Sequence, residues 1–104
     1  MKLRFYLSPS GANPVRKHLD SLNRDEAARV FAAIRYIEAN GLDGSVVARQ
    51  IRGKLWEIKV SSQRVFYVVI NGPVMILLHA YSKQSQKAPT REIEIAERRM
   101  KEVT

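Results

Sequence analysis

The sequence predicts an α+β fold, a single domain over residues 1–104 with the order β-α-α-β-β-β-α. Three observations predict it. Residues 55–82 are rich in β-forming residues and are divided by short turns. Residues 14–40 carry apolar residues at helical spacing, and so do residues 90–103. Strands joined by short turns are antiparallel, so we expect a mostly antiparallel, twisted sheet with a helical hairpin on one face and a C-terminal helix.

The chain is expected to begin with a strand over residues 2–7, followed by two helices. Asn13-Pro14 supplies an N-cap and a proline at the first helical position. Asn23, with Glu26 three residues later, resembles a capping box, and Asn40-Gly41 is typical of a helix C-terminus. The apolar positions of these elements are Leu3, Phe5 and Leu7 in the strand, Val15, Leu19 and Leu22 in the first helix, and Ala27, Phe31, Ile34 and Ile37 in the second.

Three further strands are expected at residues 55–60, 64–70 and 74–82, before a helix capped by Thr90. An even-numbered turn at Ser61-Ser62 fixes which side chains share a face. The predicted core face consists of Trp56, Ile58, Val60, Val65, Tyr67, Val69, Val74, Ile76, Leu78 and Ala80. The opposite face is expected to carry Glu57, Lys59, Arg64, His79, Tyr81 and Lys83, with Phe66, Val68, Met75 and Leu77 toward its other end. Lys59 is expected directly across from Arg64.

The positive charge of the chain is local. Residues 49–87 contain seven Lys and Arg against one acid, Glu57, and so supply six of the eight net positive charges. A basic cluster on a sheet is typical of a surface that binds a polyanion, most often a nucleic-acid backbone. The alternative is a solvated basic face that favours solubility.

Composition excludes several classes of site. The absence of cysteine rules out disulfides and thiolate metal ligands, and two isolated histidines do not form a metal site. We therefore expect no metal and no cofactor. No apolar run approaches the roughly 20 residues of a membrane span. We expect a cytoplasmic protein that does not contact membranes.

Three stretches carry a resemblance to a known family. They are RQIRGKLWEIKV, QRVFYVVINGPVMILLHAYSKQSQKAP and REIEIAERRM. Together they resemble the RelE/ParE superfamily of bacterial toxins, in particular its HigB-like branch, which is related to phage-derived proteins. The resemblance implies a toxin of a type II toxin-antitoxin system. It also implies a ribosome-dependent mRNA endonuclease (an mRNA interferase) that binds the A site of the 70S ribosome. The implied partners are messenger and ribosomal RNA and a cognate antitoxin, expected to be of the helix-turn-helix type.

The resemblance also implies roles for individual residues. Arg64 corresponds to a position that binds phosphate and stabilises the transition state, and Lys59 to a proton acceptor or electrostatic partner. Glu57 stands where RelE itself has a lysine. Lys83 corresponds to the basic position after the last strand, with Lys87 as a possible helper. The catalytic tyrosine near the C-terminus of RelE has no match, because the corresponding residues are Lys87-Ala88-Pro89.

The implied reaction sets requirements that these residue types can meet. Metal-free cleavage needs a group that accepts the 2′-hydroxyl proton, cations for the phosphoryl oxygens and an acid for the 5′-oxygen. Arg64 suits phosphate because a guanidinium binds it bidentately. Lys59 and Glu57 are alternative bases, and Glu57 is equally suited to holding Lys59 in place. His79 is a further catalytic candidate, since histidine titrates near neutral pH, or else a strand residue that fixes packing.

RNA contacts are expected from a second set of residues, namely Arg52, Lys54, Tyr81 and Lys87. Tyr81 is either a ring that stacks on a base or an anchor of the sheet. Two other functions remain open from the sequence. One is a ParE-like inhibitor of DNA gyrase that does not cleave RNA, and the other is a nucleic-acid-binding module without activity.

Overall fold

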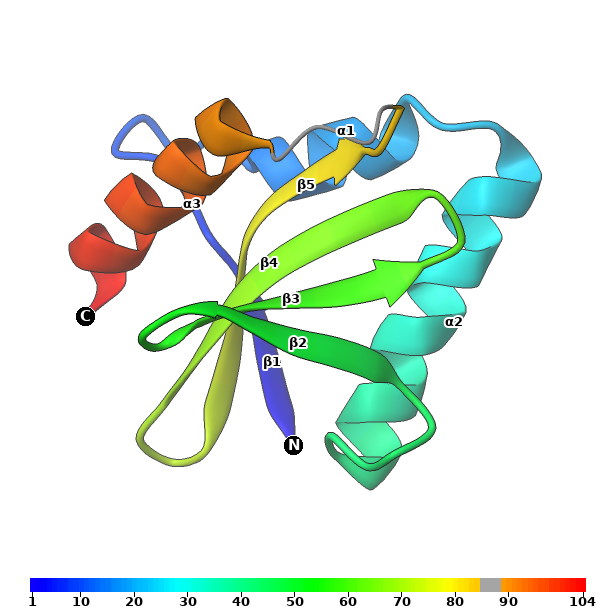
Figure 1. Cartoon of the computed structure of the whole chain (residues 1–104), viewed down its shortest axis with the longest axis horizontal. Helices are drawn as coiled ribbons and strands as arrows, with labels where there is room; N and C mark the ends of the chain where they lie inside the picture. The colour runs from blue at the N-terminus through cyan, green and yellow to red at the C-terminus, as the bar shows by residue number, and fades with distance from the viewer. Residues whose placement is uncertain (85–88) are drawn as a thin grey trace.

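The computed structural model describes residues 1–84 and 89–104 and has a five-stranded sheet with helices on both faces (Figure 1). In chain order the elements are β1 (Lys2–Phe5), α1 (Pro14–Asp20), α2 (Arg24–Asn40), β2 (Val47–Arg52), β3 (Leu55–Val60), β4 (Gln63–Ile70), β5 (Val74–Ser82) and α3 (Thr90–Val103). The predicted α+β class is confirmed. None of the helices in the described residues has the length and apolar content needed to cross a membrane.

The sheet has the strand order β1-β5-β4-β3-β2. β1 pairs in parallel with β5, and the other neighbours are antiparallel. β2 is a strand that the predicted order lacks. It lies at the edge of the sheet, most of its residues are exposed, and its pairing with β3 is irregular between Gln50 and Arg52. An exposed edge strand needs no apolar stripe, so the segment VARQIR carries a weak sequence signal.

The predicted ends of α1 and α2 are confirmed in atomic detail. The Asn13 side chain accepts a hydrogen bond from the Arg16 amide (3.0 Å), and Asn23 accepts one from the Glu26 amide (2.9 Å). Gly41 ends α2 with a φ of +78°, and its amide donates to the Ile37 carbonyl at 2.7 Å. At α3 the prediction was one residue late, because Pro89 occupies the N-cap position and Thr90 is the first helical residue.

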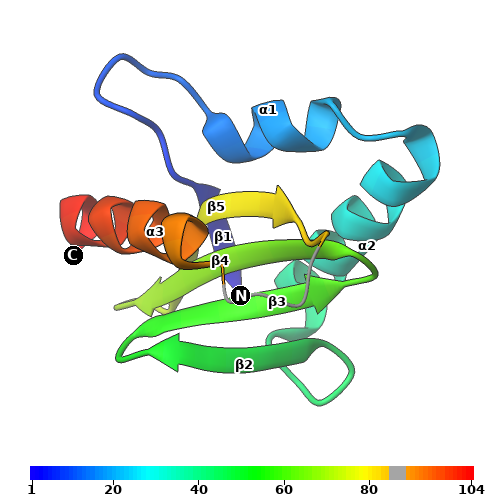
Figure 2. The same ribbon diagram turned by 45° about the horizontal axis from the view of Figure 1, so that its top comes forward.

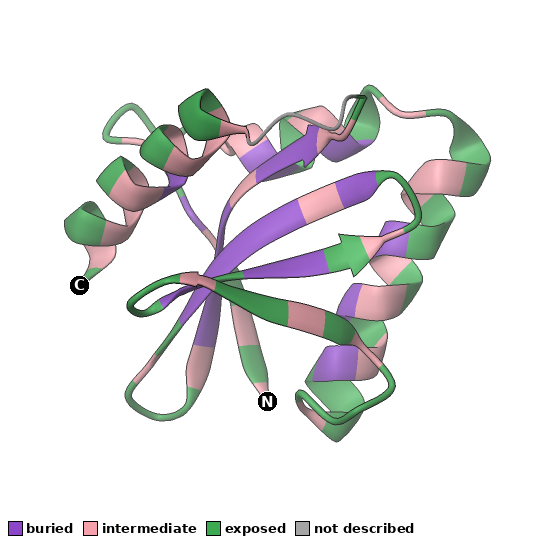
Figure 3. Ribbon diagram, viewed as in Figure 1, coloured by how far each residue is buried: buried purple, intermediate pink, exposed green. Residues whose placement is uncertain are grey.

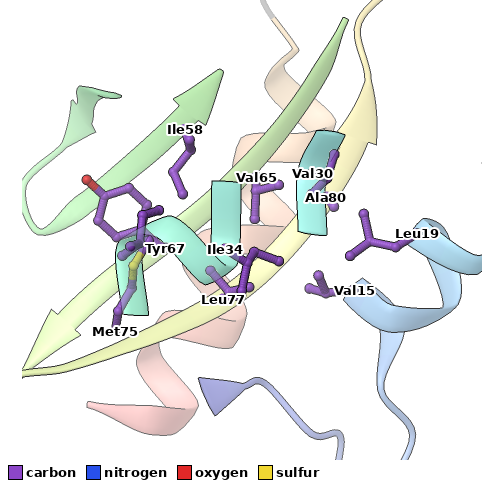
Figure 4. Close-up of a cluster of buried hydrophobic side chains, with 11 residues drawn as sticks. Val15, Leu19, Val30, Ile34, Ile58, Val65, Tyr67, Met75, Leu77 and Ala80 are labelled. Carbon is purple, nitrogen blue, oxygen red and sulfur yellow. The ribbon is translucent and has the colours of Figure 1, made fainter. Parts of the chain in front are cut away.

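One hydrophobic core lies between the helices α1 and α2 and one face of the sheet (Figure 4). Figure 3 shows the buried residues of α2 turned toward the sheet and its exposed residues turned outward. The fully or nearly fully buried members are Val15, Leu19, Val30, Ile34, Ile37, Ile58, Val65, Tyr67, Met75, Leu77 and Ala80. This core fixes the β3–β4–β5 portion of the sheet against the helical hairpin.

A second core lies on the opposite face, under α3 (Figure 2). Ala96 is fully buried there, and Ile93, Met100 and Val103 pack around it, as the apolar stripe of the helix predicts. The sheet residues beneath α3 are Leu55, Phe66, Val68, Ile76, Leu78 and Tyr81, with Tyr6 from the segment after β1.

A β-bulge in β5 corrects the predicted faces. Phe66 pairs with His79 and Tyr67 with Leu77, so Leu78 is an extra residue. A bulge of this kind reverses the alternation of side chains on either side of it. Met75 and Leu77 therefore belong to the core under α1 and α2, and Val74, Ile76 and Leu78 face α3. Each set lies on the face of the sheet opposite to the one predicted for it. Ala80, after the bulge, lies on the predicted face.

Two aromatic residues also differ from their predicted environments. Trp56, predicted on the core face, is 36% exposed and lines a cavity together with Leu42 and Asp43 from the loop after α2. Tyr6, expected on the polar side of the first strand, is 4% exposed, whereas Leu7 is 58% exposed. The reason is that β1 ends at Phe5, so the alternation that predicted these positions stops there.

Candidate functional site

Lys59 and Arg64 lie directly opposite each other at the tip of the β3–β4 hairpin, as predicted. The hairpin turns through Ser61 and Ser62, and Ser61 has a φ of +55°, which is unusual for a residue other than glycine. Arg64 Nη1 donates to the carbonyl of Ser61 at 2.8 Å and to that of Gln63 at 3.0 Å. Within the described residues Nε and Nη2 make no further bond, so they can meet a ligand while Nη1 holds the side chain over the turn.

A buried carboxylate lies beside these cations. Glu57 is 2% exposed, although it is a charged residue in the middle of a strand. Arg49 Nε lies 3.2 Å from Glu57 Oε1, and the Tyr81 hydroxyl donates to Glu57 Oε2 at 3.3 Å. A buried charge needs such partners, because losing water costs several kcal/mol that an ion pair and hydrogen bonds must offset. The sheet positions the pair, since Arg49 lies opposite Glu57 in the β2–β3 ladder.

These side chains surround a small cavity, which we call the cation cavity. Its volume is about 250 Å³, and it is lined by Val47, Arg49, Glu57, Lys59, Arg64 and Lys83. Four of the five predicted catalytic residues meet here, from β3, from β4 and from the residue after β5. Four cations around one carboxylate make a site suited to a polyanion, with a single acidic group that can accept a proton or a hydrogen bond.

Arg49 is a site residue that the sequence prediction missed. The sequence places Arg49 among the basic residues of segment 49–87, but its position in the site depends on β2, whose sequence carries a weak strand signal. With the strand assigned, the pairing of Arg49 with Glu57 is the arrangement that cross-strand opposite charges favour. The missing information was therefore the strand and its register.

Tyr81 reaches the cation cavity through its hydroxyl group. Its ring lies near those of Phe66 and His79, with centroids 5.6 and 6.4 Å away, and the residue is 9% exposed. This leaves little ring surface for a base to stack on. Burial, together with the charge of Glu57 and the hydrogen bond to it, raises the pKa of Tyr81 to about 12. The phenol is therefore protonated at neutral pH and donates to the carboxylate.

His79, the fifth predicted catalytic residue, does not line the cation cavity. Arg99 Nη1 lies 3.1 Å from Nδ1, and Glu92 Oε1 lies 3.2 Å from Nε2. A guanidinium can only donate, so Nδ1 accepts and Nε2 carries the proton that is donated to Glu92. Burial lowers the pKa of His79, with the Glu92 carboxylate opposing the shift and Arg99 adding to it. In this arrangement a neutral His79 joins β5 to α3.

The predicted RNA-binding residues are not gathered in one place. Arg52 Nη1 forms an ion pair with Glu97 Oε1 of α3 at 2.7 Å. Lys54 lies in the β2–β3 turn, beside Trp56, and lines a different cavity at the far end of the sheet. Tyr81 is at the site, as described above. Lys87 lies outside the described residues.

Metal ligands do not gather at this site. In residues 1–84 and 89–104 no group of three or more His, Asp or Glu side chains is placed to hold a metal ion.

Comparison with known proteins identifies the fold. A family model described as phage derived protein Gp49-like matches residues 17–101. A chain of the archaeal RelE–RelB complex from Pyrococcus horikoshii OT3 superposes with a TM-score of 0.59 at 18% identity, over 84% of this chain and 97% of that one. A chain of the toxin-antitoxin complex RelBE2 from Mycobacterium tuberculosis gives 0.52 at 16% identity, over 81% and 92%. No curated protein sequence matches significantly. The predicted resemblance to RelE-type toxins is confirmed at the level of the fold.

Proposed function

Since the chain belongs to the Gp49-like family of phage-derived proteins and has the fold of RelE toxins, we propose that it is an mRNA endonuclease toxin that acts on the ribosome. The observation that carries the proposal is the cation cavity, where Arg49, Lys59, Arg64 and Lys83 converge on the buried Glu57. A protein that acts only by binding has no need of a carboxylate buried among phosphate-binding cations.

The proposed reaction is attack of a ribose 2′-oxygen on the adjacent phosphorus. The 2′-oxygen bonds to phosphorus, the bond to the 5′-oxygen breaks, and a 2′,3′-cyclic phosphate and a free 5′-hydroxyl result. Glu57 is the candidate acceptor of the 2′-hydroxyl proton, and Lys59 is the alternative that Glu57 would orient. The departing 5′-oxygen needs a proton, for which Lys83 is the candidate donor.

Arg64 is the proposed clamp on the phosphoryl oxygens. Its Nη1 bonds to the turn carbonyls fix the guanidinium before substrate arrives, and this preorganisation is what makes a charge effective in a transition state. Lys59, directly across the ladder, adds a second positive charge to the same place. Two like charges held together on a sheet are unfavourable until an anion lies between them.

The proposed partner outside the ribosome is a cognate antitoxin. The two similar solved structures are complexes of a toxin with its antitoxin. In this chain the cation cavity is open and strongly basic, so an acidic or amphipathic segment that covers it, or the helices beside it, would block the site. A complex in which the antitoxin contacts neither place and leaves the cavity unchanged would contradict this part of the proposal.

The test separates cleavage from binding. Purified protein is added to translating ribosomes and, in parallel, to free RNA of the same sequence, and the RNA ends are mapped. We expect cuts on the ribosome and little cleavage of free RNA, because the ribosome can hold the message in an in-line geometry that free RNA seldom adopts. Intact messages together with DNA breaks after induction would instead support the gyrase-inhibitor alternative.

A further inference from the structure

A second and larger cavity lies next to the cation cavity. It has a volume of about 830 Å³ and is enclosed by α1, the end of β5 and the first turn of α3. α1 contributes Lys17 and His18, the chain after β5 contributes Lys83, and α3 contributes Glu92. We call it the α1–α3 cavity. Its size is within the range of sites that bind small organic molecules.

The two cavities adjoin along the end of β5. Lys83 lines both of them. Tyr81 lines the α1–α3 cavity, and its hydroxyl reaches Glu57 in the cation cavity. An oligonucleotide bound in the cation cavity can therefore continue past Lys83 into the α1–α3 cavity.

The charges in the α1–α3 cavity favour an anion. Arg99 is held in the wall, because its Nη1 donates to the Leu78 carbonyl at 3.0 Å and to His79, and its guanidinium carbon lies 5.2 Å from the centre of the Tyr6 ring. Glu92, the acid among the described lining residues, is held by His79. Among the described residues neither Lys17 nor Lys83 forms an ion pair. Their ammonium groups are therefore available to bind an added anion.

The rest of the lining suits the other parts of a nucleotide. Gln84 offers a hydrogen-bonding amide, and Pro14 and Pro89 offer apolar surface. Ser21 Oγ donates to the His18 carbonyl at 2.6 Å and Ser82 Oγ donates to Gln63 Oε1 at 3.1 Å, so these hydroxyls can still accept a hydrogen bond from a ligand. His18 is fixed in its wall, because its Nε2 donates to Gln63 Oε1 at 2.8 Å. Gln63 is 2% exposed, so this contact ties α1 to β4 from inside the molecule. The α1 wall of the cavity is therefore firmly placed before any ligand binds.

Resting on the proposed function, we infer that the α1–α3 cavity is a second RNA subsite, which binds a nucleotide next to the one at the cation cavity. Lys17 and Lys83 bind its phosphate, the serine hydroxyls and Gln84 contact its polar edges, and the proline surfaces contact its base. The ligand class is a single-stranded ribonucleotide continuous with the substrate, which is how proteins usually read RNA.

The binding test uses the full chain and a 2′-O-methyl trinucleotide, which cannot undergo attack by the 2′-oxygen. We expect its addition to shift the imidazole NMR signals of His18 and His79. Lys17→Ala should weaken binding about fivefold, the effect of losing one exposed ionic contact, with the salt dependence reduced by about 0.7 in slope. Lys101→Ala, which removes an exposed lysine from another helix, is the matched control and should bind as the wild type does.

Three results would overturn the inference. The first is unmoved histidine signals, and the second is equal weakening by Lys17→Ala and Lys101→Ala. The third is inorganic phosphate binding as tightly as the trinucleotide, which would make the cavity a simple anion site. The test is separable from that of the proposed function. If the protein binds the trinucleotide in this cavity but never cuts messages, the proposed function is contradicted and the subsite is not. If it cuts messages but does not bind the trinucleotide here, the subsite is contradicted and the proposed function is not.

Discussion

At the scale of single residues, Arg64 is the side chain on which the proposed activity depends most. We expect Arg64→Ala to reduce message cleavage on ribosomes by about a hundredfold or more, the usual cost of removing a preorganised charge. The loss of two bonds to turn carbonyls should lower the free energy of unfolding by only about 1 kcal/mol. Cleavage is measured by mapping RNA ends and folding by thermal melting. Arg35→Ala, on the exposed surface of α2, is the control. Full cleavage by a folded Arg64→Ala protein would refute the assigned role.

A second prediction concerns the effect of the Glu57–Tyr81 contact on stability at alkaline pH. The pKa of Tyr81 is raised from 10.0 to about 12, so the folded chain keeps a proton that the unfolded chain loses. The stability that this contributes is fully present below about pH 10 and is lost as the pH rises through about 12. We expect Glu57→Gln to lower the pKa of Tyr81 toward 10, because it removes the carboxylate charge. Ultraviolet titration of the phenolate measures this, with Tyr81→Phe to assign the step. An unchanged titration would mean that burial alone sets the pKa.

Residue-level prediction succeeded where pairing was local and failed where it was not. The two-residue turn at Ser61-Ser62 correctly placed Lys59 across from Arg64, because register in a tight hairpin follows from the turn length. The place of Arg49 required a strand that the sequence hardly signals. The partners of His79 come from α3, and no sequence pattern indicates which helix covers which end of a sheet. Hence His79 was a reasonable catalytic candidate that the structure places elsewhere.

At the scale of elements, the bulge in β5 is the main departure from the predicted sheet. Strict alternation assigned Leu77 and Leu78 to the wrong faces, and one extra residue accounts for both errors. Residues 74–78, up to and including the extra residue, are apolar without interruption. Since both faces of the sheet are buried at this point, apolar patterning cannot detect the shift. The helices were better predicted, because their caps depend on neighbouring residues alone.

The bulge is open to a direct test with two neighbouring leucines. Leu77→Ala and Leu78→Ala should each lower the free energy of unfolding by about 2–5 kcal/mol, since both side chains are fully buried. The voids left by the two substitutions should lie on opposite faces of the sheet. In NMR spectra Leu77→Ala should perturb α1 and α2 most strongly, and Leu78→Ala should perturb α3. If Leu77→Ala instead perturbed α3 and Leu78→Ala perturbed α1 and α2, the side chains of β5 would alternate strictly and the bulge would be refuted.

At the scale of the whole molecule, the cation cavity gathers four positive charges, those of Arg49, Lys59, Arg64 and Lys83. Binding to single-stranded RNA should therefore weaken as salt rises, and Arg64→Ala should reduce the slope of log affinity against log salt by about 0.7, the contribution of one phosphate contact. Arg35→Ala removes the same charge from the back of α2 and should leave the slope nearly unchanged. Equal slopes for the two variants would mean that net charge, and not the cation cavity, attracts the RNA. The measurement is a fluorescence-anisotropy titration with a 2′-O-methyl oligonucleotide.

The parallel pairing of β1 with β5 has a consequence for how the chain reaches this structure. Lys2 pairs with Val74, so a loop of roughly 70 residues must close before these two strands meet. The pairings among β2, β3, β4 and β5 join neighbouring segments, which can form early. Non-local contacts of this kind raise the contact order and slow folding. Until β1 docks, β5 presents an open edge to other chains. We therefore expect the rate-limiting step to be the arrival of β1, the strand synthesised first and placed last.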